Sequence, residues 1–249
     1  MRIFKNIFGS GKLKHPLDIS SFMVDMHSHL IPGIDDGVKD YDSAVKIIRE
    51  LISLGYKKVI TTPHIMADIY KNDPDIILKG LSELREVIKK ENLDIEIDAA
   101  AEYLMDDSFK EHLKNGNLMT LKDRYILVEV PYFSAPPDLY ENIFDLQINN
   151  YKIIMAHPER YSFWYDDFSK LEDLKNRDVY FQLNLLSLTG YYPYPVKKIA
   201  EKLIDAEMID FVGSDLHNTQ QLSYFRKILN TPALKKLISS EKIKNRLLY

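Results

Sequence analysis

Residues 25–37 read DMHSHLIPGIDDG and follow a short apolar run at residues 22–24. Side chains of an extended strand alternate between its two faces, so we expect His27 and His29 to lie on the same side of the backbone. Two such imidazoles can hold one metal ion, and the acidic pair at 35–36 offers the oxygen ligands that manganese or a second ion would take. A buried pair of structural histidines is the alternative interpretation of this motif when it is considered alone.

The length and composition of the chain are those of an ordinary globular protein. Its 249 residues allow one large domain or two small ones, and a single (β/α) barrel of this size is common. The formal net charge of -4 provides no broad basic field, which argues against nucleic acid as the main partner. The chain has no cysteine, which excludes disulfides, thiolate metal sites and cysteine-nucleophile phosphatases, and fits a cytoplasmic location.

Residues 1–20 form a basic N-terminal arm in which lysine and arginine are interspersed with apolar side chains. The arm has neither the uninterrupted apolar stretch nor the cleavage site of a secretory signal, and we find no transmembrane segment. We expect a solvated arm, and the alternative is a short amphipathic anchor that makes weak contact with a membrane or a partner. Residues 21–249 show no linker and are expected to form one domain.

From residue 21 onward, short β-rich runs alternate with longer helical patterns. Strands are predicted over residues 22–26, 58–62, 95–100, 125–130, 152–156, 179–184 and 209–213. Helices are predicted over residues 41–54, 74–91, 107–115, 137–149, 168–176, 195–207, 222–229 and 232–249. This alternation is typical of parallel βαβ units, so we expect an α/β fold.

Titratable side chains gather at the carboxyl ends of the predicted strands. Five of the seven histidines lie at or just beyond such an end, namely His27, His29, His64, His157 and His217. Three carboxylates have the same placement, namely Glu102, Glu129 and Asp215. Any one of these residues could be an unrelated turn or cap, but the carboxyl ends of parallel barrel strands meet on one face, so we expect the whole set to form one site.

This set exceeds what one metal ion needs, so the sequence predicts two or three divalent ions bridged by carboxylate and hydroxide. Glu102 is the first candidate for a bridging ligand. A set of imidazoles and carboxylates without sulfur favours manganese, iron or zinc over magnesium alone. Such a cluster generates hydroxide at neutral pH and stabilises the charge of an in-line displacement at phosphorus.

Arg160 lies three residues after His157, where its planar guanidinium could hold a phosphate, although an isolated arginine is more often a surface ion-pair partner. Aromatic residues follow the same strands and would suit an aromatic substrate, or would form an apolar rim or a dimer surface. They are Tyr132, Phe133, Tyr161, Phe163, Trp164, Tyr165, Tyr191, Tyr192 and Tyr194.

The motifs together resemble the PHP (polymerase and histidinol phosphatase) superfamily from about residue 23 to residue 218. The resemblance rests on DMHSH with PGIDDG (25–37), TTPH (61–64), AE (101–102), VE (128–129), AHPER (156–160), QLN (182–184) and GSDLHN (213–218). Within this superfamily the chain is most similar to the bacterial manganese-dependent protein-tyrosine phosphatases of capsule and exopolysaccharide loci.

This resemblance implies a distorted, TIM-like (β/α)7 barrel with a three-metal site. The implied metal ligands are His27, His29, Asp36, His64, Glu102, Glu129, His157, Asp215 and His217. It further implies that Arg160 binds the phosphoryl group and that the substrate is a phosphotyrosine protein, a bacterial tyrosine kinase that controls polysaccharide export. Relatives often carry a second arginine shortly after the last histidine; residues 218–223 contain none, and whether Arg226 replaces it stays open.

The mechanism expected from these residues is direct attack of a metal-bridging hydroxide on phosphorus, without a phosphoenzyme. A metal-bound water, His64 or Asp215 would protonate the leaving group. One alternative is a small-molecule phosphatase such as a histidinol phosphatase, which would use the same metals. Others are an amidohydrolase, which needs a lysine at a strand end that the sequence lacks, and a non-catalytic metal-binding module of the export machinery.

Overall fold

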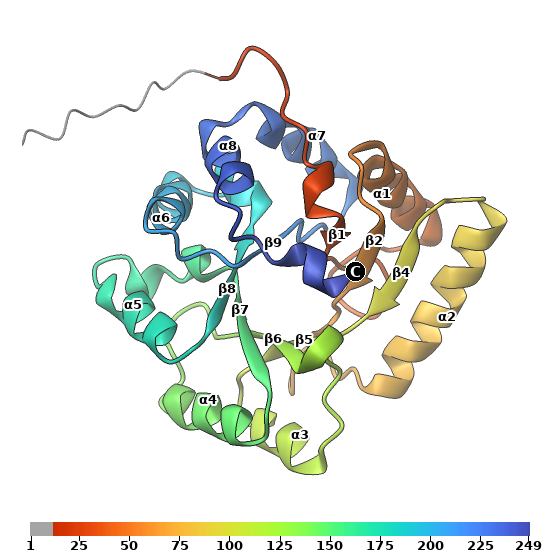
Figure 1. The fold of residues 1–249 in the computed structure, drawn as a ribbon. Coiled ribbons are helices and arrows are strands. Elements are labelled where there is room, and N and C mark those ends of the chain that lie inside the picture. The colour runs from red at the N-terminus through yellow and green to blue at the C-terminus, as the bar shows by residue number, and fades with distance from the viewer. Residues whose placement is uncertain (1–11) are drawn as a thin grey trace, which may run out of the picture.

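A computed structural model describes residues 12–249, and the first eleven residues of the predicted arm lie outside this range. The strands in it are β1 (Val24–Asp25), β2 (Lys58–Thr61), β3 (His64–Ile65), β4 (Glu96–Ala99), β5 (Glu102–Leu104), β6 (Tyr125–Glu129), β7 (Lys152–Ala156), β8 (Tyr180–Asn184) and β9 (Phe211–Gly213). The helices are α1 (Tyr41–Ser53), α2 (Pro74–Lys90), α3 (Phe109–Asn115), α4 (Leu139–Ile148), α5 (Ser169–Asn176), α6 (Tyr194–Asp205), α7 (Leu222–Phe225) and α8 (Pro232–Ser239). The helices lie around the outside of the strands (Figure 1).

The strands of this range pair in parallel, in the orders β1-β2-β4 and β3-β5-β6-β7-β8-β9. Pro63 has no amide hydrogen and separates β2 from β3, but the pairing continues across this break because Glu102 N donates to Pro63 O over 3.1 Å. At the other side of β1, Ser28 forms an isolated parallel bridge with Leu216, just after β9. The predicted α/β fold with parallel strands is therefore confirmed, and each predicted strand contains an observed one.

Local capping explains where the first helices begin and end. Asp40 caps α1 by accepting a hydrogen bond from Ser43 N over 2.7 Å, and Asp73 caps α2 by accepting one from Ile76 N over 2.8 Å. Gly55 follows α1 with φ of +92°, a conformation that favours glycine at this position. The observed helices begin and end within two residues of most of the predicted boundaries.

Two predicted helices differ from the observed ones. The helix predicted over 222–229 divides into α7 and a 3₁₀ segment, Arg226–Asn230, and the last predicted helix is shorter than expected. We expected one helix over residues 232–249, but α8 ends at Ser239 and a short 3₁₀ turn, Asn245–Leu248, follows it. The buried Asn245 explains the change of direction. Its Nδ2 donates to Val24 O over 2.8 Å and to Val212 O over 2.7 Å, and its Oδ1 accepts from Val212 N over 2.9 Å. The C-terminal segment thus joins β1 to β9, and Figure 1 shows it lying over the strands.

The described part of the predicted arm packs against the protein. Leu13 N donates to Asn230 O over 2.9 Å, Leu17 N donates to Leu229 O over 2.8 Å, and Ile19 is buried. The domain boundary at residue 20 stays a prediction. Among the described helices, none is long and apolar enough to span a bilayer.

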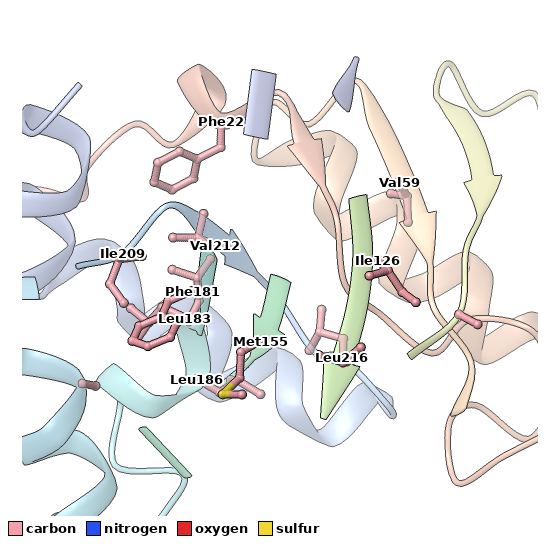
Figure 2. Packing of buried hydrophobic residues seen from close by; sticks show 14 of the residues in the cluster. Phe22, Val59, Ile126, Met155, Phe181, Leu183, Leu186, Ile209, Val212 and Leu216 are labelled. Carbon is pink, nitrogen blue, oxygen red and sulfur yellow. The ribbon is translucent and has the colours of Figure 1, made fainter. Parts of the chain in front are cut away.

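Apolar side chains cover both faces of the strands, as expected for a parallel sheet. Val59, Met155 and Val212 belong to a large cluster that includes buried residues of the helices, and Figure 2 shows part of it around Phe181 and Leu183. The residues that alternate with them belong to a second cluster, made up of Val24, Met26, Ile60, Ala100, Leu121, Tyr125, Leu127, Ile154, Ala156, Phe211 and Leu248. With both faces packed, the strands form a rigid support for the side chains at their carboxyl ends.

Candidate metal centre

The structure brings the nine predicted metal ligands together at the carboxyl ends of the strands. Two follow β1, one begins β3, one begins β5, one ends β6, one follows β7 and two follow β9; the ninth, Asp36, comes from the loop after β1. All are buried or nearly so except Asp36, whose side chain is 54% exposed. The set gathers because parallel strands end at the same edge.

Glu102 lies at the middle of the cluster and contacts four histidines. Its Oε2 is 3.1 Å from His27 Nε2, 3.4 Å from His29 Nε2 and 3.2 Å from His64 Nδ1, and its Oε1 is 3.0 Å from His157 Nε2. Burial disfavours the ionised carboxylate, but His27 and His64 hold the pKa of Glu102 well below its usual range. A carboxylate in this place can bridge cations.

The ligand atoms form four overlapping groups, and within each group they lie within 4.8 Å of one another. The groups are His29 with Asp36, His64 and His217; His27 with His29 and Asp215; His27 with Glu102 and His157; and His64 with Glu102 and Glu129. His27, His29, His64 and Glu102 each belong to two groups. This sharing is the arrangement that a cluster of neighbouring ions needs.

Other side chains fix the ring orientation of the histidines. His27 Nδ1 donates to Gln182 Oε1 over 2.9 Å and His29 Nδ1 donates to Asp35 Oδ2 over 2.8 Å, so the Nε2 atom of each ring faces the cluster. His217 Nδ1 donates to the main-chain oxygen of Asp215 over 2.9 Å. Such partners set the tautomer of metal-binding histidines and increase their basicity.

Gln182 is a residue of the site to which reasoning from the sequence assigned no role, although QLN (182–184) is one of the motifs that carry the family resemblance. It precedes Asn184 by two positions in β8, so the strand places both side chains on the same face. Gln182 holds His27, and Asn184 Nδ2 donates to Asp215 Oδ2 over 2.6 Å. The signal that could have identified them is this two-residue spacing at the end of a strand.

Buried polar atoms without hydrogen bonds test whether the site fits metal ions. Glu129 Oε1 and Asp215 Oδ1 are buried and make no hydrogen bond of good geometry within residues 12–249, although His64 Nδ1 lies 3.0 Å from the first and His27 Nε2 lies 3.4 Å from the second. Each such atom costs about 1–3 kcal/mol when it lacks a partner. Divalent cations coordinated by imidazole and carboxylate would compensate this cost, so the residues fit divalent metal ions.

The backbone is strained at two of these residues. His157 has φ of +34° and Asp215 has φ of +51°, in a region that side chains other than glycine rarely adopt. Asp215 N donates to His27 O over 2.8 Å, and His157 N donates to Gln182 Oε1 over 3.2 Å, so surrounding bonds hold both conformations. Strain maintained in this way is common at functional sites.

Arg160 borders the cluster and is largely buried. Its Nη1 donates to Asp215 Oδ2 over 2.8 Å, and its guanidinium carbon lies 5.0 Å from the ring centre of Tyr132 and 4.8 Å from that of Tyr192. Burial and the Arg160 charge lower the pKa of His157. Arg160 is therefore an ion-pair partner of Asp215 at the edge of the cluster, and its phosphate-binding role stays a prediction.

Two of the aromatic residues that follow the strands lie in the core. Tyr161 and Trp164 are buried and pack against each other, so they do not line a mouth.

Arg226 forms a two-point ion pair with Glu50 of α1, with Nε 2.6 Å from Oε1 and Nη2 2.5 Å from Oε2. Arg226 is therefore engaged in a structural contact between α1 and the 3₁₀ segment that follows α7.

Comparisons with known proteins find similar sequences over most of the chain. The family described as "Capsular polysaccharide synthesis, CpsB/CapC" matches residues 23–238. The tyrosine-protein phosphatase YwqE of Bacillus subtilis is 29% identical over 203 residues, which cover 81% of this chain and 80% of that protein. The tyrosine-protein phosphatase CpsB of Streptococcus agalactiae is 24% identical over 202 residues, covering 79% and 83%.

A solved structure shows the same similarity in three dimensions. The crystal structures of YwqE from Bacillus subtilis and CpsB from Streptococcus pneumoniae are described as those of unique metal-dependent tyrosine phosphatases. The matching chain superposes with a TM-score of 0.78 and 27% identity, over 91% of this chain and 94% of the other.

Proposed function

The chain belongs to the CpsB/CapC family of capsular polysaccharide synthesis, and from this premise we propose that it is a metal-dependent protein-tyrosine phosphatase. The observation that carries the proposal is Glu102 in contact with four histidines beside the buried guanidinium of Arg160. A metal cluster that activates water and an arginine that binds an anion are the two parts that hydrolysis of a phosphate ester requires.

We propose that the strands form the distorted (β/α)7 barrel that the sequence predicts. The bridge between Ser28 and Leu216 supports this closure, together with the hydrogen bond from His29 N to Leu216 O over 3.0 Å. Continuation of β2 into β3, and of β4 into β5, would give seven strands in all.

The proposed metal ligands are the nine residues gathered around Glu102, and the proposed ions are two or three Mn²⁺, with iron or zinc as alternatives. When bound, such ions lower the pKa of water and neutralise charge on phosphoryl oxygens. Because the structure holds the histidine rings in place through Gln182 and Asp35, binding would require little rearrangement.

Arg160 is proposed to hold the phosphoryl oxygens through the guanidinium nitrogens that do not contact Asp215. Tyr132 and Tyr192 lie against the guanidinium and fix its plane. Burial opposes ionisation of Asp215, but His27 and His217 hold its pKa well below its usual range. Asp215 therefore carries no proton near neutral pH, so we propose that it positions Arg160 and does not protonate the leaving phenolate.

The proposed substrate is a phosphotyrosine protein, and the proposed partner is a bacterial tyrosine kinase of polysaccharide export. Support comes from the capsule family that matches the chain and from the names of its relatives. A small-molecule substrate such as histidinol phosphate would use the same metals, so substrate profiling is the direct test.

The test compares phosphate release from a phosphotyrosine peptide and from histidinol phosphate by the Mn²⁺-loaded protein. His29→Ala and Arg160→Ala should each reduce peptide hydrolysis at least about 100-fold, since each removes a charged or ligating group from the reacting centre. The matched controls are His15→Ala and Arg49→Ala, both exposed and away from the cluster. Preference for histidinol phosphate would refute the tyrosine-phosphatase proposal, and no release from either compound would favour a non-catalytic metal-binding module.

A further inference from the structure

Asn184, the last residue of β8, is hydrogen-bonded to two groups that contact the Arg160 guanidinium. Its Nδ2 carries two hydrogens, and it donates to Asp215 Oδ2 over 2.6 Å and to Tyr192 Oη over 3.1 Å. The same Asp215 oxygen accepts from Arg160 Nη1 over 2.8 Å, and the Tyr192 ring centre lies 4.8 Å from the guanidinium carbon. One buried amide therefore holds both the ion-pair partner of Arg160 and a ring that packs against it.

The guanidinium of Arg160 has few other supports. Within residues 12–249 its hydrogen bond to Asp215 is the only one that its side chain makes, which leaves the other N–H groups for an anion. Its other ring contact is with Tyr132, which is 40% exposed. The orientation of the guanidinium thus depends mainly on Asp215 and Tyr192, and Asn184 contacts both.

The main chain next to Arg160 is anchored to the same strand end. The buried Glu159 directly precedes Arg160, and its Oε1 accepts from Asn184 N over 3.0 Å and from Ser187 Oγ over 2.7 Å. Residues 159, 160, 215 and 184 therefore form a closed ring of hydrogen bonds and chain links. Because Asn184 N belongs to the main chain, a substitution of the Asn184 side chain keeps this anchor and removes only the contacts of the amide.

We propose that Asn184 is a positioning residue that holds the Arg160 guanidinium in the orientation that binds a phosphoryl group. Asn184 acts through Asp215 and Tyr192 and does not itself bind the phosphoryl group. This inference rests on the proposed phosphatase function and deepens it, because it names the group that orients the arginine. A planar guanidinium binds phosphate oxygens through paired N–H groups, so its plane has to be fixed before the substrate arrives.

The test is a double-mutant cycle between Asn184 and Arg160, measured as kcat/KM of the Mn²⁺-loaded full chain for a phosphotyrosine peptide. Asn184→Leu keeps the approximate shape of the side chain and removes the amide, so kcat/KM should fall about tenfold. In an Arg160→Ala background the same change should lower kcat/KM no more than about twofold, because the group that it orients is absent. Tyr192→Phe removes a single hydrogen bond and should lower kcat/KM about threefold, again only with Arg160 present. This second variant carries the test if Asn184→Leu does not fold.

Binding of inorganic phosphate, measured by calorimetry, is a readout that does not depend on turnover. Asn184→Leu should weaken it about tenfold at wild-type Mn²⁺ content, measured by elemental analysis. Asn245→Leu is the matched control, because both side chains are fully buried and each makes three hydrogen bonds. The partners of Asn245 are main-chain atoms of Val24 and Val212, so this variant should lose stability but keep the wild-type kcat/KM and phosphate affinity.

Three results would overturn the inference while leaving the phosphatase intact. The first is an equal loss of kcat/KM from Asn184→Leu with and without Arg160. The second is an equal loss from Asn245→Leu. The third is a loss of bound Mn²⁺ that accounts for the lost rate, since Asn184 would then support Asp215 as a metal ligand. A wild-type protein that neither hydrolyses the peptide nor binds phosphate would instead refute the proposed function, and the inference with it.

Discussion

Replacing Glu102 by glutamine is the most informative single change at the metal centre. Glutamine keeps the size and shape of the side chain but removes the negative charge that contacts His27, His29, His64 and His157. We expect the folded protein to lose metal, because cations in this cluster would then face one carboxylate fewer.

The expected magnitude follows from the distances around Glu102. Its oxygens lie 3.0–3.4 Å from four ring nitrogens, and we take about 4 Å as the charge separation for a cation that those nitrogens would hold. A unit charge at that distance contributes about 4 kcal/mol at an effective dielectric constant of 20. Since 1.4 kcal/mol is a factor of ten, Glu102→Gln should weaken metal binding about 10³-fold.

The assay is metal content after dialysis against graded free Mn²⁺, measured by elemental analysis, with circular dichroism as the test of folding. Glu96→Gln is the control, because Glu96 is exposed and begins β4, the strand that precedes β5 in the chain. Folded Glu102→Gln protein that binds Mn²⁺ within about threefold of the wild-type affinity would refute the assignment of Glu102 as a bridging ligand.

Three further changes test Arg160, Glu159 and Asn245. Arg160→Lys keeps the charge but loses the planar contact with Tyr132 and Tyr192, so kcat/KM for a phosphotyrosine peptide should fall about 10- to 100-fold at unchanged metal content; an unchanged rate would contradict this role. Burial raises the pKa of Glu159 from 4.5 to about 7. The folded state therefore binds more protons than the unfolded state between these values, and the stability present below pH 4.5 is lost as pH rises through 7, by about 3 kcal/mol. Urea unfolding of Glu159→Gln should show a smaller decline between pH 5 and 8, and parallel curves would refute this. Asn245→Ala removes three buried hydrogen bonds and should lower the free energy of unfolding by about 2–4 kcal/mol, an effect that an unchanged urea midpoint would exclude.

The strands and the histidine positions were predictable because both follow from local patterns. Alternation of apolar runs with helical periodicity locates βαβ units, and parallel topology then brings strand ends together regardless of their separation in the sequence. His27 and Asp215 illustrate this, because they are far apart in the sequence and yet His27 Nε2 lies 3.4 Å from Asp215 Oδ1. The metal-ligand roles themselves stay predictions.

Loop conformation and long-range contacts were not predictable from the same patterns. Asp35 and Asp36 are adjacent acids, yet Asp35 is buried against His29 Nδ1 while Asp36 faces His64 and His217 at 3.5 Å and 3.6 Å. The backbone conformation of the loop at these two residues decides which acid faces the cluster. The end of the last helix likewise depends on Asn245, whose partner Val24 lies 221 positions earlier in the chain.

The position of β1 has a consequence for synthesis of the protein. β1 pairs with β2 on one side, while its other side meets residues after β9 and the side chain of Asn245. Translation at about 5–20 residues per second leaves roughly 10 to 45 seconds between emergence of β1 and emergence of Asn245. During that interval β1 has one unpaired edge, and His27 and His29 lack the acid from the far end of the chain. On the proposed ligand roles, His27 and His29 would thus be in the chain well before Asp215, so the metal centre could be completed only after nearly the whole chain has been made.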